Sequence, residues 1–297
     1  MEMLPLVPFG PRATCTLETC PIEMSVFQYR PSLGANIAFV CLYSILMFIH
    51  TGLGVRWKSW WFMSCVAVGC LTEILGYGGR IMLYYNPFSF PGFMIQIICV
   101  GSAPVFYSAA IYVTITKTIE SLDPRLSLIR PSLYYIIFIL CDVFALVLQG
   151  VGGALSTSSS GQSTTGVNLA LAGLSFQVIT MVVFCGLLVD YLNRYSRSKS
   201  TAFISVRLKT FLVCLGAAVL LILARCAYRV GELSEGYQGH LIHNESLFIA
   251  LEGALIVIAV SALCVGHPGF VFSLTKKGLK IRDNGSSGDV EVVLQNK

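Results

Sequence analysis

The chain has 297 residues, of which 55% are hydrophobic and only 12% are charged, whereas a soluble domain carries about 25% charged residues. This composition excludes an ordinary soluble globular domain and predicts a polytopic membrane protein. The net charge is only +5 and no basic run is interleaved with aromatic residues, so a nucleic-acid partner is not expected.

The segment 1–31 is predicted to be an extracellular N-terminal tail and not a secretory signal. It carries acidic residues, lacks a basic start and contains early prolines that interrupt any apolar run. Cys15 and Cys20 lie in this tail, where oxidation is permitted. The sequence therefore favours neither a disulfide between these two cysteines nor two free thiols.

Seven segments are apolar enough to cross a bilayer as helices, which requires about 20 residues each. We therefore expect an all-α fold, with a seven-helix transmembrane domain over 32–272 and a cytosolic C-terminal tail over 273–297. Pro104 lies near the middle of the third span, so neighbouring helices must satisfy the backbone group that it frees. The predicted spans cover roughly 33–54, 59–82, 92–117, 132–154, 166–191, 208–230 and 246–267.

The distribution of basic residues predicts the orientation. Fifteen of the 20 Lys and Arg residues fall on the side of the C-terminus, four fall on the side of the N-terminus, and Arg225 lies within a span. By the positive-inside rule, the N-terminus lies outside and the C-terminus is cytosolic. Asn244 begins the acceptor pattern Asn-Glu-Ser in an external loop, and is a glycosylation candidate whose closeness to the seventh span leaves its occupancy open.

Polar residues lie within most of the spans, although a charged side chain there costs about 2.5–3.5 kcal/mol on insertion scales. In the second and sixth spans they form single stripes at 100° per residue. Most lie in the outer half of the membrane or near its middle, which predicts a polar cavity open towards the outer leaflet. The candidate ligand-binding residues are Glu73, Tyr77, Arg80, Gln96, Asp142, Gln149, Gln177, Arg225, Tyr228, Arg229 and Glu252.

Two interpretations of these residues stay open. Acids of the second, fourth and seventh spans can pair with arginines of the sixth and fix the helix packing. Alternatively, a carboxylate and an arginine hold the head group of an amphiphile. Glu232 is expected near the interface, where a simple helix-end role suffices. The sequence contains no catalytic triad, metal-ligand spacing or Walker A motif, so no enzyme activity, metal or cofactor is expected.

Four motifs follow one another in the order of the spans. They are E-x-x-G-Y-x-x-R from Glu73 to Arg80, D-x6-Q-x2-G-G from Asp142 to Gly153, G-x3-Q from Gly173 to Gln177, and R-x2-Y-R-x2-E from Arg225 to Glu232. Over about residues 25–275, this order resembles the fungal lipid-translocating exporter family, also called RTA-like (resistance to aminocholesterol). The resemblance implies a multi-pass plasma-membrane transporter or floppase for amphiphilic lipids such as sphingoid long-chain bases, linked to lipid asymmetry and resistance to toxic lipids or drugs.

Two other functions fit the same sequence. One is a seven-helix receptor or stress sensor that binds a lipid without moving it, and the other, implied by one branch of the family, is a porphyrin or haem transporter. The chain lacks the D-R-Y and N-P-x-x-Y motifs of common G-protein-coupled receptors, and 245–267 contain no lysine for a retinal Schiff base. The ligand, the direction and energy source of transport and the oligomeric state are left open.

Overall fold

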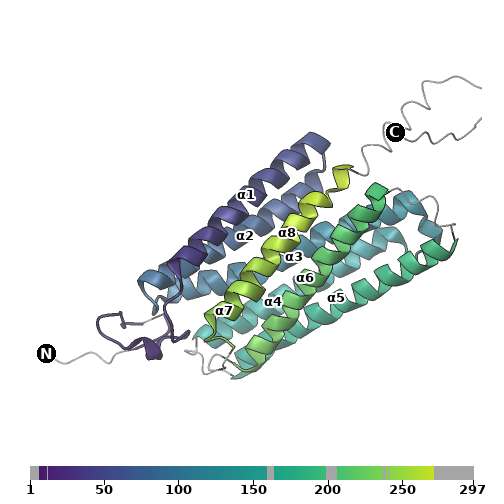
Figure 1. Cartoon of the computed structure of the whole chain (residues 1–297). Coiled ribbons are helices and arrows are strands. Elements are labelled where there is room, and N and C mark those ends of the chain that lie inside the picture. Colours follow the sequence, from purple (N-terminus) through teal and green to yellow (C-terminus); the bar gives the residue numbers. More distant parts are fainter. Residues whose placement is uncertain are drawn as a thin grey trace, which may run out of the picture.

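The computed structural model describes residues 7–11, 13–158, 164–198, 206–236, 239 and 241–270. Within these ranges, seven helices are long and apolar enough to cross a membrane, and they lie side by side in one bundle (Figure 1). The chain is thus an all-α, multi-pass membrane protein, as predicted. The helices are α1 (Leu33–Trp57), α2 (Trp60–Tyr85), α3 (Phe90–Leu122), α4 (Pro131–Ser158), α5 (Thr164–Ser198) and α6 (Val206–Ser234), followed by α7 (Glu245–Leu247), a π-helical segment η4 (Phe248–Ala254) and α8 (Leu255–Val265).

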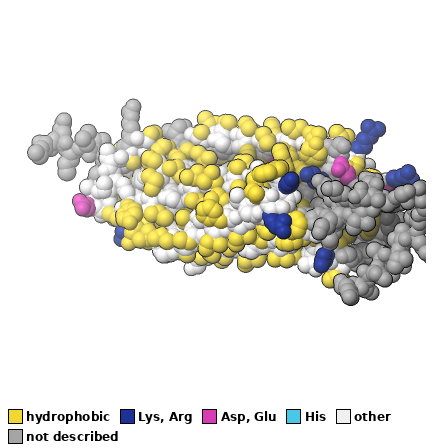
Figure 2. All heavy atoms as spheres, turned by 90° about the horizontal axis from the view of Figure 1, so that it is seen from above, with side chains coloured by type: hydrophobic (Ala, Val, Ile, Leu, Met, Phe, Trp, Pro, Cys, Tyr) yellow, Lys and Arg dark blue, Asp and Glu magenta, His cyan; other side chains and the backbone are white. Residues whose placement is uncertain are grey.

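The outer surface of the bundle is apolar, because lipid tails and not water surround it. Figure 2 shows hydrophobic side chains over the middle of one face, while the Lys and Arg side chains visible there gather mainly towards the end where α8 finishes. This distribution agrees with the positive-inside argument. The membrane orientation itself stays a prediction.

The N-terminal segment 7–32 folds onto one end of the bundle. Cys15 and Cys20 form a disulfide and pack against Phe88 in the turn between α2 and α3. Further along, Phe27 packs with Phe93 of α3 at the same end. We call this the tail end of the bundle. Segment 273–297, predicted to be the cytosolic tail, lies outside the described residues.

Close approach of glycines fixes two helix pairs. In the pair α2 and α3, a Cβ added to Gly79 would lie 2.7 Å from the carbonyl oxygen of Gly92. In the pair α4 and α5, a Cβ on Gly152 would meet the backbone of Ala170, and one on Gly166 would lie 2.8 Å from the carbonyl oxygen of Gly152. Small residues of this kind let transmembrane helices pack backbone to backbone.

The seventh span was not predicted to be irregular. It begins at Asn244, whose side-chain oxygen accepts a hydrogen bond from the backbone N–H of Leu247 at 3.3 Å and so caps the helix. In η4, Gly253 packs against the ring of Phe39, and its carbonyl accepts a hydrogen bond from the Tyr43 hydroxyl at 3.2 Å. Helix α1 therefore holds the π-helical segment in place. Glycosylation of Asn244 stays a prediction.

Candidate functional site

Arg225 of α6 is the centre of a buried set of charges. Its side chain is only 1% exposed, and its Nη2 lies 2.8 Å from Oε2 of Glu252 in η4 and 4.0 Å from Oε1 of Glu73 in α2. Both carboxylates are fully buried. The stripe that the sequence indicated on α6 therefore points inward, and one arginine joins three helical elements.

Arg225 has a further hydrogen-bond partner, the backbone carbonyl of Val100, which Pro104 leaves without a donor. Proline has no backbone N–H, so the carbonyl of Val100, four residues earlier in α3, has no α-helical donor. Nη2 of Arg225 donates a hydrogen bond to this carbonyl. The arginine thus satisfies the backbone acceptor that the proline exposes, as expected for a proline within a membrane helix.

The charges continue towards the tail end of the bundle. Nη1 of Arg229 lies 2.7 Å from Oε2 of Glu232, and its Nε lies 3.5 Å from the second oxygen of Glu252. Together with Arg225 and Glu73, these residues alternate in sign along one line, and we call the five the charged network. With every group ionised, its three carboxylates and two guanidinium groups leave one excess negative charge.

Arg80 belongs to a separate cluster at the tail end. Its guanidinium donates to the side-chain oxygen of Asn36 at 3.2 Å and to the hydroxyl of Tyr29 at 3.0 Å. It lies 3.6 Å from Glu245 and 3.8 Å above the ring of Phe248. Burial raises the pKa of Tyr29 above its usual 10.0, so the hydroxyl stays neutral as a partner for the arginine. Because α1, α2, the N-terminal segment and the seventh span all meet at Arg80, its main visible role is structural.

The remaining candidates divide between aromatic and amide contacts. Tyr77 is buried against Phe39 and Tyr43 of α1, with ring centroids 4.8 and 5.8 Å away. On α4, Gln149 donates to Gln177 of α5 at 2.9 Å. Tyr228 is half-buried beside the charged network on α6.

Asp142 does not lie where the sequence suggested. It was expected to face the arginines of α6, but it lies against Tyr112 of α3, and no described arginine forms an ion pair with it. Its carboxylate is buried. The expectation was wrong about the partner, because Asp142 also lies near Cys226 of α6 and not at an arginine; a stripe within one helix does not reveal which residue of the next helix it meets.

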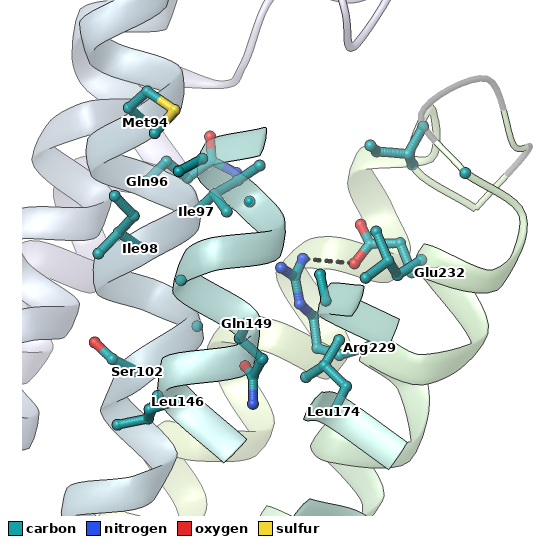
Figure 3. A pocket seen from close by; sticks show the side chains of 18 of the residues that line it. Met94, Gln96, Ile97, Ile98, Ser102, Leu146, Gln149, Leu174, Arg229 and Glu232 are labelled. Carbon is teal, nitrogen blue, oxygen red and sulfur yellow. Dashed lines mark hydrogen bonds and ion pairs between the residues drawn. The ribbon is translucent and has the colours of Figure 1, made fainter. Parts of the chain in front are cut away.

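A cavity of about 310 Å³ lies between α3, α4, α5 and α6 near the tail end. Figure 3 shows Gln96 and Ile97 on one side and the paired Arg229 and Glu232 on the other, with Gln149 between them. Most of its other walls are apolar. Of the predicted residues, Gln96, Gln149 and Arg229 line it. The others lie outside its lining: Glu73, Tyr77, Arg80, Asp142, Gln177, Arg225, Tyr228 and Glu252.

Glu232 is the wall residue whose role the sequence analysis missed. It was expected near the membrane interface in a simple helix-end role, but it is only 5% exposed and lines the cavity together with Phe27 of the N-terminal segment and Ile242 of the loop before α7. The pairing of Glu232 with Arg229 could have been predicted from the sequence, because residues three apart are neighbours on the surface of a helix. No group of three or more metal-binding side chains is assembled within the described ranges.

Several known proteins are similar to this chain over most of its length. Residues 66–275 match the family described as RTA1 like protein. The sphingoid long-chain base transporter RSB1 of Saccharomyces cerevisiae (strain Lalvin EC1118 / Prise de mousse) is 33% identical over 82% of this chain and 73% of its own length. Protein RTM1 of the same species is 25% identical over 82% and 92% of the two chains. Protoporphyrin uptake protein 1 of Saccharomyces cerevisiae is 29% identical over 70% of each. No solved structure matches.

Proposed function

The chain belongs to the RTA1-like family, and on this premise we propose that it moves an amphiphilic lipid of the sphingoid long-chain base type between the two leaflets of a membrane. The relative named as a sphingoid long-chain base transporter, similar over most of both chains, supports this substrate class. The plasma membrane, with the N-terminus outside, is the proposed location. In this orientation the cavity lies in the outer half of the bilayer.

The observation that carries the proposal is the cavity itself, which combines one polar wall with apolar surroundings. A sphingoid base has an ammonium group that suits a carboxylate and a long alkyl chain that suits an apolar wall. Glu232 is the carboxylate that lines the cavity. Arg229 also contacts Glu252 at 3.5 Å, so Glu232 can turn to an ammonium group without leaving the arginine unpaired.

The charge balance favours a cationic head group. The charged network carries one more carboxylate than guanidinium group, so in an apolar interior the odd carboxylate either binds a proton or pairs with a further cation. A bound ammonium group supplies the missing positive charge. Glu73, Arg225 and Glu252 then hold the wall residues in place and do not touch the ligand.

The experiment is reconstitution in liposomes with a fluorescent sphingoid base, scoring the flip rate with and without a proton gradient. We expect Glu232→Gln to slow flipping at least tenfold, because the ammonium loses its carboxylate partner. Asp190→Asn is the control, since Asp190 pairs with Arg194 on the exposed side of α5. Normal flipping by Glu232→Gln would refute the role of the cavity wall.

Two alternatives are separated by the same experiment. Saturable binding without flipping would identify a lipid-binding receptor or sensor. The relative named as a protoporphyrin uptake protein makes a porphyrin the second candidate cargo. Its two carboxylates suit Arg229 but meet the excess negative charge of the network, so faster movement of a porphyrin than of a sphingoid base would overturn our choice of substrate.

A further inference from the structure

The wall of the cavity between α3 and α4 contains two glycines that face open space. A Cβ added to Gly101 of α3 or to Gly150 of α4 would meet no atom within 4 Å, although both residues line the cavity. The glycines at the tight contacts, such as Gly152 and Gly79, would meet neighbouring backbone at once. Gly101 and Gly150 therefore serve no helix contact and leave the wall without side chains.

This part of the wall also reaches the lipid-facing surface. Ile98, one turn from Gly101 on α3, is 54% exposed and nevertheless lines the cavity. Gly150 is exposed as well, while Ser102 and Leu146 beside it are half-buried. In Figure 3, Ile98 and Ser102 stand on one helix and Leu146 on the next, along the seam between them. The cavity lining is thus continuous with the outside of the bundle at this seam.

The tail end of the cavity is covered instead. Phe27 of the N-terminal segment lines the cavity and is only 4% exposed. Ile242, from the loop before α7, packs with it. An amphiphile would have to displace this apolar cover to enter along the bundle axis, whereas the seam between α3 and α4 needs no such movement.

A separate observation points to a ligand inside. The side-chain oxygen of Gln96 is buried and has no hydrogen-bond partner within the described structure, and Gln96 lines the cavity. A buried acceptor left without a donor is unfavourable. A hydroxyl or ammonium group of a ligand in the cavity would satisfy this oxygen.

We propose that the cavity opens sideways into the bilayer through the seam between α3 and α4 at Gly101 and Gly150, and that this opening holds the alkyl chain of an amphiphile whose head group lies between Gln96 and Glu232. The inference rests on the proposed function for its ligand class. It adds the route of entry, which is from within a leaflet and not from water.

The test fills the opening with side chains. Gly101→Leu and Gly150→Leu each place a branched apolar group there, at positions where an added Cβ meets no neighbour within 4 Å. The matched controls are Gly52→Leu in α1 and Gly186→Leu in α5, because both glycines are exposed and also face open space, but away from the cavity. All four changes raise helix propensity alike, so folding, checked by size exclusion, should be retained throughout.

Two readouts are taken in liposomes. The first is the flip rate of the fluorescent sphingoid base, which we expect to fall at least tenfold in both seam variants and in neither control. The second is labelling by a long-chain amine and a long-chain alcohol, each with a photoactivatable group in the alkyl chain. In the unmodified protein we expect labelled peptides from 98–102 and 146–154, with the labelling lost in the seam variants.

The outcomes separate the two proposals. If either alkyl probe labels the seam but no sphingoid base is moved, the opening stands and the transport function is refuted. If the base is moved and the seam variants flip it as fast as the controls do, the opening is refuted and the transport function stands. Labelling that falls on other helices, or that persists in the seam variants, also overturns the opening.

Discussion

Replacement of Arg225 by Ala tests how much the charged network contributes to the stability of the bundle. The guanidinium is almost fully buried, touches the Glu252 carboxylate at 2.8 Å, lies 4.0 Å from the Glu73 carboxylate and binds the Val100 carbonyl. Its removal leaves the buried Glu73 carboxylate without a cation, and leaves Glu252 with only the longer 3.5 Å contact to Arg229. Loss of one partner of a buried ion pair destabilises a protein by about 3–5 kcal/mol, and we expect a loss of this size for Arg225→Ala.

The measurement is unfolding of the purified protein in mixed micelles by titration with a denaturing detergent, followed by circular dichroism. Arg194→Ala is the control, because Arg194 forms an exposed pair with Asp190 at 2.8 Å, and such a pair contributes about 0–1 kcal/mol. If Arg225→Ala unfolds like this control, the network does not hold the helices together.

A compensated variant separates lost charge pairing from lost packing. Arg225→Met combined with Glu73→Gln and Glu252→Gln removes the cation together with the carboxylates that face it. Removal of one partner is costly because it leaves an uncompensated buried charge. This variant leaves no such charge at these three positions, so it should regain most of the loss. Recovery of stability without recovery of transport would assign the charges to function.

Three further predictions concern the packing around the site. Tyr29→Phe removes a hydrogen bond to a buried arginine, and should lower the unfolding free energy by about 1.5–3 kcal/mol in the same titration; an unchanged midpoint would contradict this bond. Gly152→Leu drives a side chain into the backbone of α5, and should abolish the monodisperse peak on size exclusion that Gly186→Leu retains. The double change Cys15→Ser and Cys20→Ser removes a disulfide of sequence separation 5, whose loop entropy stabilises the folded segment by about 2 kcal/mol. Limited proteolysis should then cleave the N-terminal segment faster while α1 stays resistant.

The helices could be predicted from the sequence because the bilayer imposes a simple condition of length and apolarity. The predicted spans match the observed helices within a few residues at most ends. The larger differences are at α3 and α5, which continue to Leu122 and Ser198 past the predicted ends at 117 and 191. Hydropathy finds the part of a helix that lies in lipid, and does not detect polar turns that extend beyond it.

The candidate site was predicted only in part, because a stripe on one helix does not say what faces it. The inward direction of Arg225 followed from the sequence, but the position of Asp142 against Tyr112 did not. Glu232 lines the cavity together with the N-terminal segment, which was expected to be a plain tail. Partners such as Asn36 for Arg80 are distant in sequence and are brought together only by the packing of α1 on α2.

The π-helical segment sets the rotational phase of the seventh span. A π-turn spans one residue more than an α-turn, so η4 acts as a single inserted residue that turns the chain beyond it by about 100° relative to an unbroken α-helix. With this offset, Glu252 can face Arg225 while Ile256 and Val260 still pack in the core. Deletion of one residue between Phe248 and Ala254 would restore a regular helix, and the carboxylate and the apolar face of α8 would then compete for the same direction.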